Sequence, residues 1–222
     1  MRRFNRHTMR IFNDRYPLIG PAFYAVSLQL FLTQWFVASR WPTPYSFTAN
    51  VISDLGNTMC GTFGDRYVCS PWYSWMNASF VFLGATMIAG SALIYQEFKK
   101  TRASRLGFTL MALAGLGTII VGLAAENVDP PFHGLGAFMV FVFGNLALII
   151  LGSSLNISGA FKIYSLLSGV IALIALGLFV TKTYLGLGPG GMERVVAHPQ
   201  TVWLTLFGLY MTRSHFRRKR QK

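Results

Sequence analysis

The sequence predicts an all-helical integral membrane protein, a bundle of six transmembrane helices with both termini in the cytoplasm. Three observations predict this fold. Of the 222 residues, 53% are hydrophobic and only 12% are charged, whereas a soluble domain has about 25% charged residues. The apolar residues form long runs that suit membrane-spanning helices. Sixteen of the twenty Lys and Arg residues, Lys162 included, flank the same side of those runs, which is the cytoplasmic side in membrane proteins.

Six apolar runs divide the chain. They lie at about 18–38, 72–95, 106–125, 135–151, 163–181 and 201–211. A bilayer core of about 30 Å takes about 20 helical residues, so each run is expected to be a helix. The last run is short. Its helix starts at about Val195 if it begins before His198-Pro199, and Pro199 then lies in its first turn. Five helices would leave the basic C-terminal residues outside the cell, so we predict six.

Three basic clusters define the predicted domains, at residues 2–15, 99–105 and 213–222. We predict a basic cytoplasmic segment over 1–17, a six-helix membrane domain over 18–212 and a basic cytoplasmic tail over 213–222. The location is the inner or plasma membrane. Because the positive charge is divided among short stretches beside the membrane, it predicts contact with anionic lipids rather than with nucleic acid. No feature indicates a protein partner.

A cleaved signal peptide is the alternative interpretation of the first apolar run. The run is longer than the apolar core of a signal peptide, and no small-residue cleavage site follows it. The sequence Trp41-Pro42-Thr43-Pro44 follows instead. We therefore interpret the first run as a membrane helix.

The predicted topology places most acidic residues at the outer side. The outer loops, about 39–71, 126–134 and 182–200, contain five of the seven acids and two of the four histidines. The inner loops after the second and fourth runs have only about ten residues each, which is too few for a folded cytoplasmic domain. A functional site is therefore expected at the outer end of the bundle.

The two cysteines, Cys60 and Cys69, both lie in the first outer loop. A disulfide between them is expected in an oxidising compartment and would contribute about 2–3 kcal/mol. Two free thiols are the alternative. A structural zinc site is disfavoured because two cysteines provide only half of the four ligands.

Polar residues also recur at three- and four-residue spacing in this loop: Asn50, Ser53, Asp54, Asn57 and Thr58. On a helix they would share one face, so the pattern predicts an amphipathic helix at the membrane interface. In the alternative interpretation, Ser53 or Asn50 caps a short helix that Gly56 ends.

These residues resemble a known family. The segments that carry the resemblance are Asn50-Val51-Ile52-Ser53-Asp54-Leu55-Gly56-Asn57-Thr58, Arg66-x-Val68-Cys69-Ser70-Pro71, Met76-Asn77-Ala78-Ser79-Phe80 and Gly191-Met192-Glu193-Arg194. They look like the prokaryotic polytopic membrane family called domain of unknown function 998. The resemblance covers most of the chain and implies a six-helix membrane domain, but it brings no reaction. Ile52-Ser53-Asp54 alone is also similar to eukaryotic membrane proteins of the Frag1, DRAM and Sfk1 type, and three residues carry nothing over.

The candidate site residues come mainly from the three outer loops. The candidates for acid–base catalysis are Asp54, Glu126 and Glu193. The candidates for binding are Asn50, Ser53, Asn57, Asn77 and Arg194. The candidate metal ligands are His133 and His198. An acid at membrane depth needs a partner, and those expected for Glu126 are His133, His198 and Arg194.

Three functions fit this set of residues. The first is a protein that binds a lipid or an envelope component through an outward-facing polar pocket. The second is a metal-dependent hydrolase that acts on a lipid headgroup, with zinc as the candidate cofactor, because carboxylates and imidazoles are ligands of catalytic zinc. No His-Glu-x-x-His or Gly-x-Ser-x-Gly motif supports it. The third is a small-molecule transporter, for which no inverted repeat is visible. Whether the protein is an enzyme stays open.

Polar and small residues within the apolar runs predict contacts between helices. Gln29, Gln34, Asn77 and Asn145 are expected to form interhelical hydrogen bonds, and glycines such as Gly84 and Gly115 to allow close approach.

Overall fold

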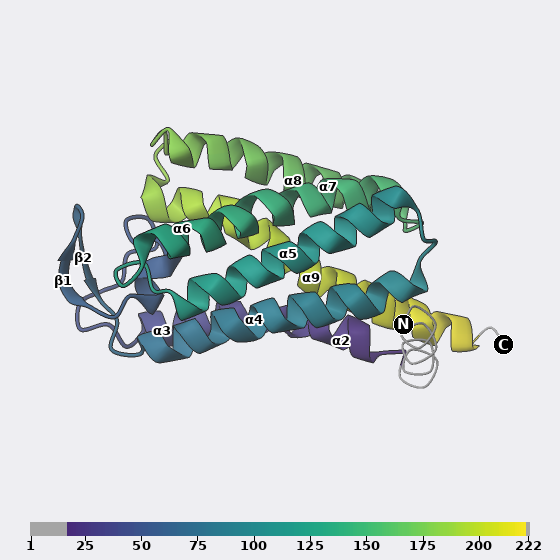
Figure 1. Ribbon diagram of the computed structural model, residues 1–222, viewed down its shortest axis with the longest axis horizontal. Helices are drawn as coiled ribbons and strands as arrows, with labels where there is room; N and C mark the ends of the chain where they lie inside the picture. The colour runs from purple at the N-terminus through teal and green to yellow at the C-terminus, as the bar shows by residue number, and fades with distance from the viewer. Residues whose placement is uncertain (1–16, 221–222) are drawn as a thin grey trace.

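The computed structural model describes residues 17–220, which form a helical bundle with a small β-hairpin at one end (Figure 1). The helical elements are α2 (Ile19–Ala25), η1 (Val26–Leu28), α3 (Gln29–Ala38), η2 (Ile52–Gly56), α4 (Tyr73–Ile94), η3 (Tyr95–Glu97), α5 (Arg102–Leu123), α6 (Pro130–Phe138), the π-helical η4 (Met139–Gly144), α7 (Asn145–Ser154), α8 (Gly159–Val180) and α9 (Gly188–Arg220). The hairpin strands are β1 (Cys60–Phe63) and β2 (Arg66–Cys69). Residues 1–16 of the predicted N-terminal segment, and the last two of the tail, lie outside the described residues.

Four helical stretches are long and apolar enough to cross a membrane: Tyr73–Glu97, Arg102–Leu123, Pro130–Ser154 and Gly159–Val180. The predicted all-helical membrane fold is therefore confirmed. The first predicted span is divided into α2, η1 and α3, and polar residues such as His198 and Gln200 interrupt the apolar sequence of α9. Both nevertheless run along the bundle (Figure 1). The count of six spans stays a prediction.

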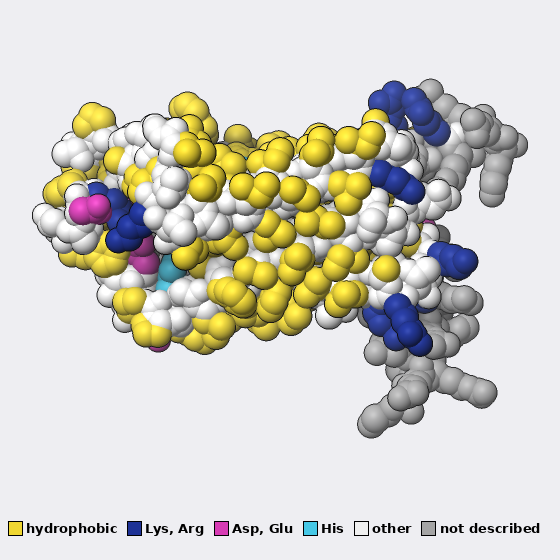
Figure 2. All heavy atoms as spheres, turned by 90° about the horizontal axis from the view of Figure 1, so that it is seen from above, with side chains coloured by type: hydrophobic (Ala, Val, Ile, Leu, Met, Phe, Trp, Pro, Cys, Tyr) yellow, Lys and Arg dark blue, Asp and Glu magenta, His cyan; other side chains and the backbone are white. Residues whose placement is uncertain are grey.

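The ends of the bundle differ in character. We call the end that carries η2 and the hairpin the outer end, and the end where α2 begins and α9 ends the inner end (Figure 1). In the face shown in Figure 2, an apolar belt separates basic side chains at the inner end from acidic, basic and histidine side chains at the outer end. Large apolar side chains are exposed on the helices, for example Trp35 at 69% and Ile174 at 60%. An exposed apolar surface of this extent suits contact with lipid.

Small residues and amide side chains join the helices, as predicted. A Cβ atom on Gly84 would collide with the carbonyl oxygen of Gly115, so α4 and α5 are in close contact there. The Gln29 amide donates to the Ser79 carbonyl (3.2 Å) and accepts from the Ser79 hydroxyl (2.7 Å), which joins α3 to α4. Asn145 of α7 donates to the Val196 carbonyl of α9 (3.0 Å). Such bonds contribute roughly 0.6 kcal/mol each in membrane proteins.

The start of α9 corrects the sequence analysis. This helix begins at Gly188, well before the predicted start, and Pro199 lies inside it rather than in its first turn. The early start follows from contact with the first outer loop. The Gly190 N–H donates to the Thr48 carbonyl (2.8 Å), and a side chain on Gly190 would collide with the Asn50 carbonyl. Because Gly190 and Asn50 are 140 residues apart in the sequence, no local pattern could predict their contact.

The segment 50–58 is not the predicted amphipathic helix. It contains only the single 3-10 turn η2, which Val51 precedes and Gly56 ends. The alternative interpretation was correct about Gly56, but neither Ser53 nor Asn50 is the N-cap residue. The polar side chains of this segment point to partners in different parts of the protein, and these tertiary hydrogen bonds outweigh the helical pattern.

The predicted disulfide between Cys60 and Cys69 is present. The two residues also pair with each other at the open end of the antiparallel hairpin. Gly64, in the turn between the strands, has φ +62°, a left-handed conformation that glycine adopts without strain.

Replacing Cys60 and Cys69 together by serine is expected to lower the free energy of unfolding by about 2–3 kcal/mol, because the unfolded chain regains the freedom that the short closed loop removes. Thermal unfolding in detergent, with and without reductant, measures the loss. Reductant should lower the melting temperature of the wild-type protein and leave that of the double variant unchanged. Equal melting temperatures of wild type and variant without reductant would contradict the expectation.

Candidate functional site

Asp54 lies at the centre of the outer end, in η2, and its side chain is fully buried. Its Oδ2 accepts hydrogen bonds from the Val51 N–H and the Asn50 amide, both at 3.0 Å. Arg66 binds both carboxylate oxygens, Nε at 2.7 Å and Nη2 at 2.6 Å. This two-pronged geometry is the strongest form of an arginine–carboxylate pair. Four donors therefore occupy the Asp54 carboxylate, which suits an anchor of the loop better than a free catalytic base.

Glu126, in the turn after α5, lies beside Asp54 and near the same nitrogen of the Arg66 guanidinium. Its Oε1 accepts from the Asn57 amide (2.8 Å), and its Oε2 lies 3.7 Å from Arg66 Nη2. Burial, followed by a hydrogen bond to Asp54 and the charge of Asp54, raises the pKa of the Glu126 carboxyl to about 8. Glu126 therefore carries a proton at neutral pH, and one guanidinium faces one carboxylate and one neutral acid. We predicted His133, His198 and Arg194 as the partners of Glu126. Its partners are instead Asn57, Arg66 and Asp54.

Arg66 is the functional residue that sequence reasoning missed. It lies on β2, three residues before the bridged Cys69, and its side chain is 21% exposed. The available signal was the scarcity of basic residues in the outer loops, where only Arg40, Arg66, Lys182 and Arg194 are basic. A cation in a loop that contains two acids, Asp54 and Asp65, is the natural counter-ion for a buried carboxylate.

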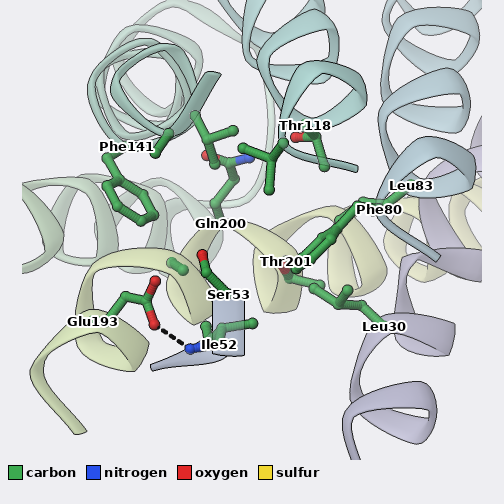
Figure 3. Close-up of a pocket in the computed structure, with 14 residues that line it drawn as sticks. Leu30, Ile52, Ser53, Phe80, Leu83, Thr118, Phe141, Glu193, Gln200 and Thr201 are labelled. Atoms are coloured by element: carbon green, nitrogen blue, oxygen red, sulfur yellow. Dashed lines mark hydrogen bonds between the residues drawn. The ribbon is translucent and has the colours of Figure 1, made fainter. Parts of the chain in front are cut away.

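Glu193 and Arg194 bring the first turns of α9 to the same loop. The Glu193 carboxylate, 5% exposed, accepts a hydrogen bond from the Ile52 N–H (Figure 3). Arg194 points elsewhere, donating from Nη1 to the carbonyl of Asn50 (2.9 Å) and from Nη2 to the Tyr45 hydroxyl (2.6 Å). Glu193 and Arg194 thus join α9 to the chain on either side of Val51, at Ile52 and at Asn50.

The two candidate metal ligands have different surroundings. His133, in α6, is close to the Ser53 hydroxyl through Nε2 (3.0 Å) and to the Ala124 carbonyl through Nδ1 (2.7 Å). A carbonyl only accepts, so Nδ1 carries the proton and Nε2 accepts from Ser53. His198 is close to the Gln34 amide oxygen (3.3 Å). Across residues 17–220, no three His, Cys, Asp or Glu side chains are grouped so that they could hold a metal ion. The structure thus does not bring the predicted zinc ligands together.

The remaining predicted residue, Asn77, also supports η2. From the first turns of α4, its amide donates to the Gly56 carbonyl (3.0 Å), and a side chain on Gly56 would collide with the Asn77 oxygen. The predicted polar residues therefore do meet at the outer end. Most of them hold the turn η2 and its buried acid in place.

A cavity of about 50 Å³ lies between η2 and the helices. Ser53 and Glu193 line its polar side, and Gln200, Thr118 and Thr201 approach it from the helices (Figure 3). The rest of the lining is apolar: Leu30, Ile52, Phe80, Leu83, Val121, Ala137, Val140, Phe141 and Ala197. The site thus joins a charged outer layer to the apolar interior of the bundle.

Gln200 is the unusual group in this cavity. Its side chain is 3% exposed, and within the described residues its Oε1 has no hydrogen-bond partner. Its Nε2 makes only a weak contact with the Met87 sulfur (3.9 Å). Sequence reasoning placed Gln200 where the last outer loop and the start of the last helix overlap, and it did not identify this residue as part of a site.

Comparison with known proteins gives one match. The model of the family described as "Protein of unknown function (DUF998)" matches residues 25–210, a range that includes η2, the hairpin, Glu126 and the outer half of α9. No curated protein and no solved structure matches the chain. Because the matched range is most of the 222 residues, the chain belongs to the DUF998 family.

Proposed function

We propose that this membrane protein binds an amphiphilic lipid or envelope component, and that an amine or hydroxyl group of this ligand enters the cavity beneath η2. The observation that carries the proposal is the buried Gln200 carbonyl oxygen, which lines the cavity without a donor among the described residues. A buried acceptor left unpaired costs about 1–3 kcal/mol. A ligand that donates a hydrogen bond there recovers this free energy.

The polar lining favours a donor group on the ligand. Glu193 accepts only one backbone hydrogen bond among the described residues, and Gln200 adds the unpaired carbonyl. The Ser53 hydroxyl is already engaged with His133. Acceptors without donors thus predominate, which suits an amine or a hydroxyl and disfavours a phosphate or carboxylate.

The size of the cavity limits how much of the ligand it holds. A buried water needs roughly 10–15 Å³ of such volume, so about 50 Å³ admits a small group and not a whole lipid. The remainder of the ligand would lie outside the cavity, against the apolar belt of the bundle (Figure 2). This requirement favours an amphiphile over a small soluble metabolite.

Two of the three candidate catalytic acids, Asp54 and Glu126, are engaged outside the cavity, which supports binding rather than catalysis. Four donors occupy the Asp54 carboxylate, and Glu126 is held by Asn57. Neither acid lines the cavity. These groups therefore serve to hold the outer loop over the cavity.

The test is the set of lipids that stays bound during purification. Wild-type protein extracted in mild detergent should retain, near one molecule per chain, a species that carries an amine or a hydroxyl. Gln200→Leu should retain it about tenfold less, since the hydrogen bond is worth about 1–3 kcal/mol. Native mass spectrometry and lipid analysis of the same sample measure the ratio.

Gln34→Leu is the matched control. Gln34 is equally buried, and its Nε2 is also unpartnered within the described residues, but it does not line the cavity. This variant should retain the same species as the wild type. Retention that Gln200→Leu leaves unchanged, or that both variants lose equally, would refute the proposal.

A further inference from the structure

We propose a second lipid site at the inner end of the bundle. There a groove between α4 and α5 holds one acyl chain of an anionic phospholipid, and Arg105 binds its phosphate. This site lies at the end of the bundle opposite to the cavity beneath η2 and is independent of the proposed function.

The groove has the shape of an acyl-chain site. Its volume is about 370 Å³, and small and large side chains alternate along it: Ile88, Ala92 and Tyr95 from α4 and η3, and Phe108, Ala112 and Leu116 from α5. Small residues such as Ala92 and Ala112 leave the space, and the larger ones form its walls. Apart from Arg105 at one end, the polar groups of the lining are the hydroxyls of Ser91, Tyr95 and Thr109, and the rest of the groove is apolar.

The length of the groove matches one leaflet. On α5 it extends from Arg105 to Leu116, which is roughly 16 Å at 1.5 Å per residue. The hydrocarbon core of a bilayer is about 30 Å thick, so the groove covers about half of it. A chain that starts at the Arg105 end would finish near the middle of the membrane.

The charge at the Arg105 end selects an anion. Arg105 is exposed, and its side chain forms no ion pair or hydrogen bond with the side chains described for residues 17–217. Lys99, Lys100 and Arg102 lie on the same connection between α4 and α5. Glu97 is the acid in this stretch, and none of the three ion pairs found in the described residues involves it. A free cation at the end of an apolar groove is complementary to a phospholipid whose headgroup has a net negative charge.

The experiment compares two lipids with identical chains, phosphatidylglycerol and phosphatidylcholine, bound to the full-length protein in native mass spectrometry. Wild type should retain phosphatidylglycerol preferentially. Arg105→Ala should reduce this preference about fivefold, the ratio that corresponds to about 1 kcal/mol for one basic residue at a membrane surface. Arg102→Ala is the matched control, because Arg102 is equally exposed but does not line the groove. It should change the preference less than twofold.

A second variant tests the groove itself. Thr109 is an exposed lining residue, so Thr109→Trp should fill the space without disturbing the core and reduce the retention of both lipids. Three results would overturn the proposal. They are equal effects of Arg102→Ala and Arg105→Ala, lipid retention that Thr109→Trp leaves unchanged, and a protein dimer that only Thr109→Trp dissociates. Gln200→Leu should leave this site unaffected, so the two lipid proposals fail separately.

Discussion

Replacing Arg66 by methionine is expected to lower the free energy of unfolding by about 3–5 kcal/mol, the range measured when one partner of a buried ion pair is removed. Arg66 is the cation that faces the fully buried Asp54 carboxylate. Without it, only neutral donors remain for that charge: Asn50, Val51 and the protonated Glu126. Chemical unfolding of the purified protein in detergent measures the change.

Two further variants test whether the loss of stability in Arg66→Met comes from the unpaired Asp54 charge. Arg40→Met removes another arginine of the outer end, one that lies over the Phe36 ring at 5.4 Å and is exposed. It should cost less than about 1 kcal/mol. Asp54→Asn added to Arg66→Met should recover much of the loss, because the unpaired charge is gone. Equal losses for Arg66→Met and Arg40→Met would show that the buried pair does not hold the outer loop.

The second large effect is a dependence of stability on pH. The pKa of Glu126 is about 8 in the folded protein and about 4.3 in an unfolded chain. Between these values the folded state binds more protons than the unfolded state. The contribution of Glu126 to stability is therefore complete below about pH 4 and is lost as the pH rises through about 8, at up to about 1.4 kcal/mol per pH unit.

Glu126→Gln removes this dependence, since the amide stays neutral and can still donate to Asp54. Between pH 5 and pH 8, the melting temperature of the variant should fall less than that of the wild type. This interval lies between the unfolded and folded pKa values of Glu126, which are about four units apart. At pH 8 the variant should be the more stable protein. Glu97→Gln, at an exposed acid of the inner end, is the control and should follow the wild type. Parallel curves for wild type and Glu126→Gln would contradict the raised pKa.

The membrane fold could be predicted because its signals are local. Long apolar runs fix where helices lie, and the structure shifts their ends by only a few residues for the stretches Tyr73–Glu97 and Arg102–Leu123. The largest error concerns α9, where a glycine-rich segment predicts a loop. The helix starts at Gly188 because Gly190 contacts Thr48. Such a contact between distant segments leaves no periodic trace in the sequence.

The residues of the candidate site could be predicted from the sequence, but their hydrogen-bond partners could not. Asp54, Glu126 and Glu193 were expected near one another, and the structure places all three around η2. Their partners were not predictable, since the pair of Asn57 and Glu126 spans 69 residues. The helical spacing of Asn50, Ser53 and Asn57 suggested one shared face. In the folded protein each side chain serves a different neighbour.

The disulfide between Cys60 and Cys69 closes the hairpin that carries Arg66. Structural disulfides form and persist mainly in oxidising compartments. In a chain that is inserted in the membrane but still reduced, Arg66 would lie on an open loop. The buried Asp54 carboxylate would then be poorly neutralised. The yield of folded protein is therefore expected to depend on oxidation of these two thiols.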